Sequence, residues 1–581
     1  MAHPLQRDFP RRAAALLGLC LVSLPLVASA AARDPAWGAH GMVVTSEPGG
    51  ARAGLAMLER GGNAVDAAIA TAFALAVTTP FSAGLGGGAF LLIRDAEGGI
   101  HALDARETAP AAATRDMYVR PGVPEHASRA GPLAVGTPGF VAGCALALER
   151  FGTLPLATVL EPALALAADG FAIGPYHARM IETMRGYGLA KRFPGTAAIQ
   201  FPPEGETARP GWRLVQPELA ATLRRIAAEG PEVAYSGEIG AAIVRAVRER
   251  GGILTDEDLA GYRPVLREPV SGDYRGYAIH SFPPPSSGGV ALIETLNLLE
   301  SADLASLGAG SAAAAHRIAE AMKLAFADRA AYLGDPDFVD VPTARLVSKE
   351  YAAAQRARLD PAWWRTAPWH WGDERAVRIE GPGLLRDDAG TVHLSTADAS
   401  GAAVALTMTI NTPFGSGITA EGTGILLNNE MDDFAVAIDT PNAYGLVDTR
   451  GANAVAPGKR PLSSMTPTIV ETDGRLFMVT GSPGGPRIIS TTLLSVIHVI
   501  DWRMDVSEAV SAPRLHHQWE PDVLRVEPQT ARDVVDGLRA RGHEVEVSER
   551  DWSAVEAIVV GEDGSFHGAA DPRRDGVALG F

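Results

Sequence analysis

The chain has 581 residues, of which 47% are hydrophobic and 20% are charged. This composition allows a large buried core and excludes disorder over most of the length. The formal net charge is -17, which argues against nucleic acid or an anionic membrane as a partner, because both repel an acidic protein. The length is sufficient for three or four average domains, or for one or two large interlocked ones.

The first segment, residues 1–30, has the pattern of a secretory signal. Arg11 and Arg12 precede an apolar run over 13–27, and the segment ends in the small residues Ala-Ser-Ala. We expect cleavage at the end of this segment and a periplasmic or secreted product. The apolar run is too short for a membrane span, so we expect none once the signal is removed. Of the two cysteines only Cys144 then remains, which predicts a mature chain with no intrachain disulfide.

Helical patterns dominate the first part of the chain. The segment 51–77 predicts two helices separated by Gly-Gly-Asn at 61–63, with Asn63 as the N-cap of the second helix. Residues 82–93 then predict a glycine loop that enters an apolar strand. Further helices are predicted over 139–150, 217–229, 238–250, 288–300, 311–330 and 348–358.

After Asp387 the pattern changes to short strands. These are predicted over 391–398, 402–410, 424–428, 475–480, 523–527 and 554–560. Two helices, near 487–501 and near 529–541, interrupt them. Just before this change, residues 361–371 contain four tryptophans. We interpret them as packing a long excursion onto the surface, with carbohydrate binding as the alternative.

The first two strands of this second part form a predicted hairpin. Their turn is Asp-Ala-Ser-Gly at 398–401, and their side chains alternate between two faces. Thr391 then shares a face with Thr409 and Asn411. The simple interpretation of Thr391 is a threonine that begins a strand after a loop. The alternative is that the chain is cut before this threonine, which then becomes an N-terminal residue.

A threonine hydroxyl is a weak nucleophile until a base removes its proton. Cleavage after Gly390 would release the α-amine of Thr391, whose ordinary pKa of about 7.7 to 8 makes it a suitable base within the same residue. Gly390 favours this cut, because a residue without Cβ admits close attack on its carbonyl carbon. The reaction also requires hydrogen-bond donors for an oxyanion, and Gly484 and Gly485 offer adjacent backbone N–H groups.

Several motifs, in order along the chain, are similar to one known family. They are "ARETAP" (105–110), "TVHLSTADASGAAVALTMTINTPFGSG" (391–417), "GILLNNEMDDF" (424–434), "KRPLSSMTPTIV" (459–470) and "TGSPGGPRII" (480–489). They resemble the γ-glutamyltransferases, exported N-terminal-nucleophile enzymes that cleave themselves and act on glutathione and related γ-glutamyl amides. The resemblance implies an α/β fold of four layers, αββα, with two stacked central sheets between helical layers. It also implies a large subunit (31–390) and a small subunit (391–581) that stay together as a heterodimer.

The resemblance further implies roles for individual residues. Thr391 matches the nucleophile and new N-terminus, the cleaved bond joins Gly390 to Thr391, and Thr409 assists the cleavage. Gly484 and Gly485 match the oxyanion hole. The set that would bind the γ-glutamyl substrate is Arg106, Asn411, Glu430, Asp433, Tyr444, Ser463 and Ser464.

Within this substrate-binding set, the arginine and the two serines would hold the α-carboxylate. The asparagine and the two acidic residues would hold the α-ammonium, and the tyrosine would belong to a lid over the pocket. The chemistry agrees independently, since a zwitterionic head group requires a fork-shaped cation and a pair of carboxylates. The simpler interpretations are a solvated acidic turn at Glu430 and Asp433, and a surface ion pair at Arg106.

Two residues depart from the family pattern. Val392 stands where a hydroxyl residue usually follows the nucleophile, which leaves the rate of self-cleavage open, and Ala402 stands where Ser or Asn is usual. The adjacent His516 and His517 could suggest a metal, but neighbouring side chains on a strand point in opposite directions. We therefore interpret both histidines as structural and expect neither a metal nor another cofactor.

The sequence thus predicts transfer of a γ-glutamyl group through an ester on Thr391, to water or to an amino acid or peptide acceptor. Two alternatives remain open. One is an acylase of the same fold that removes glutaryl side chains from β-lactams. The other is a non-catalytic solute-binding protein that has kept the amino-acid pocket.

Overall fold

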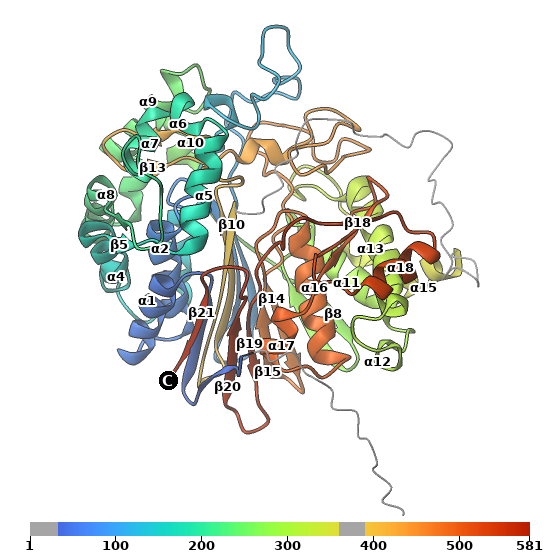
Figure 1. Cartoon of the computed structure of the whole chain (residues 1–581). Coiled ribbons are helices and arrows are strands. Elements are labelled where there is room, and N and C mark those ends of the chain that lie inside the picture. The colour runs from blue at the N-terminus through green and yellow to red at the C-terminus, as the bar shows by residue number, and fades with distance from the viewer. Residues whose placement is uncertain (1–32, 359–389) are drawn as a thin grey trace, which may run out of the picture. The chain divides into compact units, whose positions relative to one another are not determined.

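The computed structural model describes residues 33–358 and 390–581. The predicted signal segment, 1–30, and the tryptophan-rich segment, 361–371, lie outside these residues. Asp34–Phe581 form one compact unit, in which helices lie on both sides of a central group of strands (Figure 1). None of the described helices combines the length and the apolar character that a membrane crossing requires.

Within the described residues, two seven-stranded antiparallel sheets form the centre of this unit. The first, called the β10 sheet, has the order β21 (Val577–Gly580), β2 (Gly41–Thr45), β10 (Thr391–Asp398), β11 (Ala403–Thr409), β3 (Gly88–Arg94), β4 (Ile100–Ala105) and β7 (Val265–Arg267). The second, called the β15 sheet, has the order β1 (Ala36–Gly38), β20 (Phe566–Ala570), β19 (Glu556–Val560), β15 (Arg475–Thr480), β14 (Thr468–Thr472), β9 (Tyr277–Ser281) and β8 (Val270–Tyr274). Smaller pairings join β5 (Phe171–Ala172) to β6 (Arg213–Leu214), β12 (Thr419–Ala420) to β13 (Ile425–Leu426), and β16 (Leu515–His516) to β17 (Leu524–Val526) and β18 (Val545–Val547).

Each sheet packs one face against its own group of helices. One hydrophobic cluster joins the β10 sheet to α1 (Pro48–Glu59), α2 (Ala64–Thr78), α3 (Phe140–Phe151), α4 (Leu156–Asp169), α5 (Pro175–Gly186), α6 (Leu189–Arg192), α7 (Pro194–Gln200), α8 (Pro217–Glu229), α9 (Gly237–Arg248) and α10 (Asp256–Gly261). A second cluster joins the β15 sheet to α11 (Gly288–Leu299), α12 (Leu304–Leu307), α13 (Ala312–Tyr332), α14 (Thr343–Leu346), α15 (Lys349–Arg358), α16 (Arg487–Ile500), α17 (Val506–Ser511) and α18 (Arg532–Ala540). Short 3-10 turns lie at η1 (Pro132–Ala134), η2 (Pro231–Ala234) and η3 (Glu430–Asp433).

A third hydrophobic cluster fills the space between the two sheets. Met42 and Ala405 contribute to it from the β10 sheet, and Ile469 and Val479 contribute from the β15 sheet. The order of layers is therefore helices, β10 sheet, β15 sheet and helices (Figure 1). This arrangement confirms the expected four-layer αββα fold.

The parts of the chain before and after residue 390 are interleaved in both sheets. In the β10 sheet, β10 and β11 lie between β2 and β3, which come from the first part. The sequence pattern had not predicted β2, β4, β8 or β9, and it also missed helices of the first part such as α4 and α5. Every residue of β2 is buried, so this strand lacks the polar and apolar alternation that marks a strand with one wet face.

Most predicted elements agree with the structure within a few residues. The strand at 391–398 and the helix at 217–229 have the expected bounds, whereas the strand expected at 424–428 is only the two-residue β13. Asn63 is the N-cap of α2, as expected. Its side-chain oxygen accepts hydrogen bonds from the N–H groups of Val65 and Asp66, both at 3.0 Å.

We predict that Asn63→Ala lowers the free energy of unfolding by about 1 to 2 kcal/mol. The change removes the cap of a helix that is buried along its whole length, together with the 2.7 Å hydrogen bond from Asn63 Nδ2 to the carbonyl of Phe151. Chemical denaturation followed by circular dichroism measures the effect. Asn63→Ser keeps an acceptor at the cap and should lose less; an alanine variant as stable as the wild type would contradict the prediction.

Candidate active site

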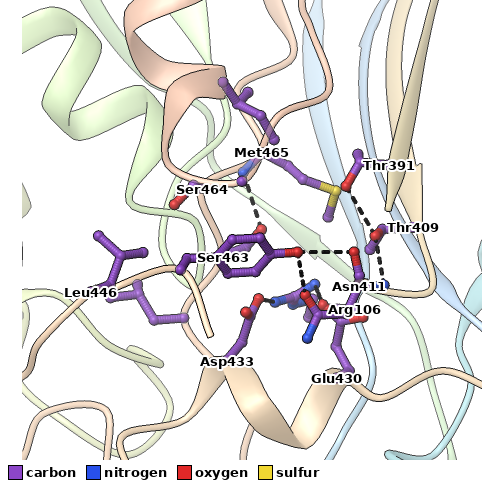
Figure 2. A pocket seen from close by; sticks show the side chains of 14 residues that line it. Arg106, Thr391, Thr409, Asn411, Glu430, Asp433, Leu446, Ser463, Ser464 and Met465 are labelled. Carbon is purple, nitrogen blue, oxygen red and sulfur yellow. Dashed lines mark hydrogen bonds and ion pairs between the residues drawn. The ribbon is translucent and has the colours of Figure 1, made fainter. Parts of the chain in front are cut away.

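Residues from both sheets meet at one end of the layered core. Thr391 begins β10, Thr409 ends β11, and Arg106 directly follows β4. From the β15 sheet, residues 463–464 lie shortly before β14, and residues 484–485 follow β15. Figure 2 shows that the side chains of Thr391, Arg106 and the two serines face a common pocket.

The pocket contains nearly all the residues that the sequence analysis predicts for the site. Its lining consists of Arg106, Thr391, Thr409, Asn411, Glu430, Asp433, Tyr444, Leu446, Leu462, Ser463, Ser464, Met465, Gly485 and Ile488. Gly484 is next to this lining, and Gly390 precedes Thr391. The apolar members were not predicted, because in the sequence they look like ordinary core residues.

The hydroxyl groups of Thr391 and Thr409 are 3.1 Å apart, across directly paired positions of β10 and β11. Thr409 Oγ1 also donates a 2.6 Å hydrogen bond to the carbonyl of Gly390 and accepts one from the N–H of Asn411 at 2.8 Å. Because Thr409 has a single hydroxyl proton, which goes to Gly390, Thr391 must be the donor in the contact between the two threonines. Thr391 is 5% exposed, so its hydroxyl is held in a nearly dry site.

The polar face of β10 is buried against the β15 sheet. His393 lies on this face, where its ring nitrogens are 2.8 Å from Thr407 Oγ1 and 3.2 Å from Ser395 Oγ. Burial lowers the pKa of His393 to about 3, so the ring is neutral. A Cβ at Gly481, which directly follows β15 of the opposite sheet, would lie 2.3 Å from this ring. The polar face of this strand is therefore a stripe between two sheets and not a surface exposed to water.

Arg106 is only 1% exposed and forms ion pairs with both Glu430 and Asp433. These contacts contradict the simpler interpretations of a surface ion pair and a solvated acidic turn. Burial disfavours the charged arginine, but the two carboxylates outweigh that effect and raise its pKa. Burial likewise raises the pKa of Glu430 and of Asp433, against the opposing influence of Arg106. The site thus concentrates acidic groups around one cation.

Glu107 is a third carboxyl group beside this cation, and it was not among the predicted site residues. One of its oxygens is 3.9 Å from Arg106 Nη1, and among the described residues neither oxygen has a hydrogen-bond partner. Burial raises the pKa of Glu107 to about 8. A Cβ at Gly88 would lie 2.3 Å from Glu107 Oε2. In the sequence, only the position of Glu107 directly after Arg106 could have indicated that it belongs to the site.

Tyr444 lines the same pocket as Thr391. Its hydroxyl is 2.8 Å from Asn411 Oδ1 and 2.9 Å from the Asn411 carbonyl oxygen. Asn411 has a φ of 76°, a strained value for a residue with a side chain. A Cβ at Gly485 would lie 2.7 Å from the Tyr444 ring, so this glycine lets the ring approach the backbone.

Gly484 and Gly485 lead into the first turn of α16. Their φ values are 136° and 57°, which favour glycine at both positions. Their carbonyls accept hydrogen bonds from the N–H groups of Arg487 and Ile488, both at 3.1 Å. On the opposite wall, Ser463 Oγ accepts a hydrogen bond from the N–H of Met465 at 3.1 Å, which fixes the turn that presents the two serines.

The histidines singled out in the sequence lie away from this pocket. His516 contacts Ser490 Oγ and Gln518 Oε1, both at 3.0 Å, and His517 contacts Asp522 Oδ1 at 3.1 Å. These contacts agree with structural roles, and the expectation of no metal stays a prediction.

A different group of three residues could in principle bind a metal. Ligand atoms of His316, Glu320 and His543 lie within 4.8 Å of one another in the described part of the chain. The two imidazoles are, however, joined directly at 2.7 Å, and Lys323 Nζ is 3.6 Å from Glu320 Oε1. A cation thus already accompanies the carboxylate, and we interpret the group as a structural network.

Two stacked sheets between helical layers, with a threonine behind a glycine at the start of a central strand, define the class of N-terminal-nucleophile hydrolases. Within that class, the model of the family described as gamma-glutamyltranspeptidase matches residues 50–581. The chain belongs to this family.

Individual relatives include both hydrolases of glutathione and acylases. A "Glutathione hydrolase proenzyme" of Escherichia coli is 47% identical over 547 residues, which cover 93% of this chain and 92% of that protein. An "Acylase ACY 1 proenzyme" of a Pseudomonas species is 42% identical over 556 residues, which cover 94% of each. Among solved structures, a cephalosporin acylase from Bacillus halodurans has a TM-score of 0.80 at 29% identity, covering 100% of this chain and 99% of that chain.

We predict that Gly390→Ala slows cleavage of the chain by at least about tenfold. A Cβ at Gly390 would lie 1.7 Å from the backbone oxygen of Asn411, so the carbonyl next to Thr391 must move, and displacements near 1 Å cost about a hundredfold. Denaturing gels of samples taken after purification measure the rate. Gly84→Ala, where a Cβ meets open space, is the control. Cleavage of Gly390→Ala at the wild-type rate would contradict the prediction.

Proposed function

We propose that the chain is a self-cleaving γ-glutamyltransferase that hydrolyses glutathione and related γ-glutamyl amides. The observation that supports this most directly is the pair of hydrogen bonds at Thr409, one to the Thr391 hydroxyl and one to the Gly390 carbonyl. They bring together a nucleophile and the carbonyl that it would attack. The identity to glutathione hydrolase proenzymes over most of the chain supports the choice of substrate.

In the proposed self-cleavage, Thr391 Oγ1 attacks the carbonyl carbon of Gly390. Thr409 donates a hydrogen bond to the oxygen on which negative charge develops. The bond from carbon to the Thr391 nitrogen then breaks, and the hydroxyl proton passes to that nitrogen, which becomes an α-amine. Water hydrolyses the ester that has formed and releases the Gly390 carboxylate and the Thr391 hydroxyl.

In the proposed turnover, the α-amine of Thr391 takes the proton of the Thr391 hydroxyl. The oxygen of that hydroxyl then attacks the δ-carbonyl carbon of the γ-glutamyl amide. The N–H groups of Gly484 and Gly485 would stabilise the oxyanion. The proton passes to the departing amine, and a γ-glutamyl ester of Thr391 remains. Water or the amine of an amino acid or peptide then attacks this ester. All of these steps use only groups of the chain, the substrates and water.

The charges around Arg106 favour a γ-glutamyl group over a glutaryl group. Both substrates have a carboxylate that Arg106 could bind with help from Ser463 and Ser464. Only the γ-glutamyl group adds an ammonium, which would compensate Glu430 and Asp433 after the substrate carboxylate has taken their place on the arginine. In a buried site an uncompensated carboxylate is costly, so a glutaryl amide is the poorer substrate.

We further propose that the two fragments, a large subunit (31–390) and a small subunit (391–581), remain one heterodimer. The interleaving of β10 and β11 with β2 and β3 supports this, because separation would expose four central strands. The signal pattern in residues 1–30 supports a periplasmic or secreted location.

The first prediction from the proposed function concerns maturation. The purified wild type should run as two fragments on a denaturing gel, and the smaller one should begin with Thr-Val-His. Thr391→Ala lacks the attacking hydroxyl and should remain a single inactive chain, whereas Thr391→Ser should still be cut. Cleavage of the alanine variant at the same bond would refute attack by Thr391. A wild-type chain that stays intact would favour the solute-binding alternative.

The second prediction concerns the ammonium group. Removing one member of a buried charge pair costs about 2 to 5 kcal/mol, so Asp433→Asn should lower the catalytic efficiency for γ-glutamyl-p-nitroanilide by roughly thirtyfold to several thousandfold. It should lower the efficiency for glutaryl-p-nitroanilide much less. The ratio of the two efficiencies is the measurement.

Arg106→Ala is the matched control, since it should impair both amides together. If Asp433→Asn leaves the ratio unchanged, Asp433 does not recognise the ammonium. If the wild type already prefers the glutaryl amide, the acylase alternative is correct.

A further inference from the structure

The first residues of β10 extend beyond one of the two neighbouring strands. On one side, β11 continues to Thr409, which is paired with Thr391. On the other side, the pairing with β2 ends where Thr45 lies opposite Leu394. On this side, none of the described strands pairs with residues 391–393.

Two side chains take the place of the missing strand on this side. Thr45 Oγ1 donates a 3.2 Å hydrogen bond to the carbonyl of His393. Arg574 Nη1 donates a 2.8 Å hydrogen bond to the carbonyl of Thr391 itself. The arginine therefore contacts the same residue whose hydroxyl is the proposed nucleophile.

We propose that Arg574 is a positioning residue that holds the nucleophilic threonine by its backbone carbonyl. The inference rests on the proposed function, in which Thr391 becomes a chain terminus. Cleavage removes the peptide bond to Gly390, and with it the connection that had fixed the threonine from its N-terminal side. The carbonyl of Thr391 is not affected by the cut, and Arg574 anchors it from the side that β2 leaves open.

The surroundings of Arg574 hold its guanidinium in place. Arg574 comes from the short loop between β20 and β21 and is 8% exposed. Its guanidinium lies 4.8 Å from the centre of the Tyr176 ring. Glu556 lies nearby and is fully buried; in the described structure neither of its carboxylate oxygens has a hydrogen-bond partner. Burial raises the pKa of Glu556, and the positive charge of Arg574 opposes that rise. The guanidinium thus has an aromatic face from α5 and a buried carboxyl group from β19 close to it.

The neighbouring residues of the loop are also anchored. Arg573 forms ion pairs with Glu527 at 2.6 Å and with Asp571 at 3.1 Å. The N–H of Arg574 donates to the carbonyl of Asp571. After Arg574, Asp575 Oδ2 accepts a 2.9 Å hydrogen bond from the N–H of Tyr176. Because the loop is held on both sides of Arg574, the guanidinium can fix Thr391 rather than follow it.

A charge-assisted hydrogen bond is stronger than a neutral one, and catalysis falls steeply when a nucleophile is displaced. We therefore expect Arg574→Gln to lower kcat for γ-glutamyl-p-nitroanilide by about tenfold to a hundredfold, the range of a lost hydrogen bond to a charged group. The inhibition constant of glutamate, which reports binding in the pocket alone, should change less than about twofold. Self-cleavage should slow as well. Arg574→Lys keeps a cation and a donor and should restore kcat to within about fivefold of the wild type.

Arg179→Gln is the matched control. The guanidinium of Arg179 also lies 4.8 Å from the centre of the Tyr176 ring. Arg179 is exposed, however, and in the described structure the donor to the Thr391 carbonyl is Arg574. Its loss should leave kcat unchanged. An equal loss in both glutamine variants would assign the effect to Tyr176 packing and overturn the proposal.

Wild-type kcat and wild-type self-cleavage in a folded Arg574→Gln variant would also overturn the proposal. If the glutamine variant does not fold, Arg574→Met removes the same hydrogen bond but keeps an apolar side chain of similar length. Wild-type kcat and self-cleavage in that variant would contradict the proposal as well. Failure of the proposed function gives a different result. A wild type that cuts itself but does not turn over γ-glutamyl amides refutes that function, while the rate of self-cleavage on gels still measures the effect of Arg574.

Discussion

The geometry of the site depends on the hydrogen bonds of one hydroxyl group, that of Thr409. It donates to the carbonyl of Gly390 and accepts from Thr391, so it links both sides of the bond that is proposed to break. This geometry exists only because the hairpin pairs Thr391 directly with Thr409. A shift of one residue would turn every side chain of the strand to the opposite face. The four packed layers, which bury both faces of β10, exclude such a shift.

The same burial sets the chemistry of the opposite wall of the pocket. Arg106 is withdrawn from water together with Glu107, Glu430 and Asp433. Burial raises the pKa of acidic groups in such a place, and a cationic substrate group beside them would favour their ionised form. The proposed selectivity for a γ-glutamyl group therefore follows from the number of carboxyl groups around one arginine, and less from the shape of the pocket. Arg574 lies outside this cluster and contacts the backbone of the proposed nucleophile.

Much of the fold could be predicted locally. The cap at Asn63, the helix at 217–229 and the strand at 391–398 are encoded in short segments, since each depends on neighbouring residues along the chain. Strands such as β2 were not recognised, because this strand is a short buried run of apolar residues without the polar and apolar alternation that identified β10. For the same reason the interleaving of strands from both parts of the chain was not visible.

The sequence by itself indicated most of the polar residues that line the pocket, because the motifs around Thr391, Arg106 and Glu430 are specific in type, order and spacing. Only the tertiary structure decided how these residues are used. It placed Glu430 and Asp433 on the guanidinium of Arg106, and it turned the polar face of β10 towards a second sheet. It also brought Arg574 to the carbonyl of Thr391, 183 positions away along the chain. The physical reason is that a pattern records the preferences of neighbouring residues, whereas contacts between distant segments depend on how the layers pack.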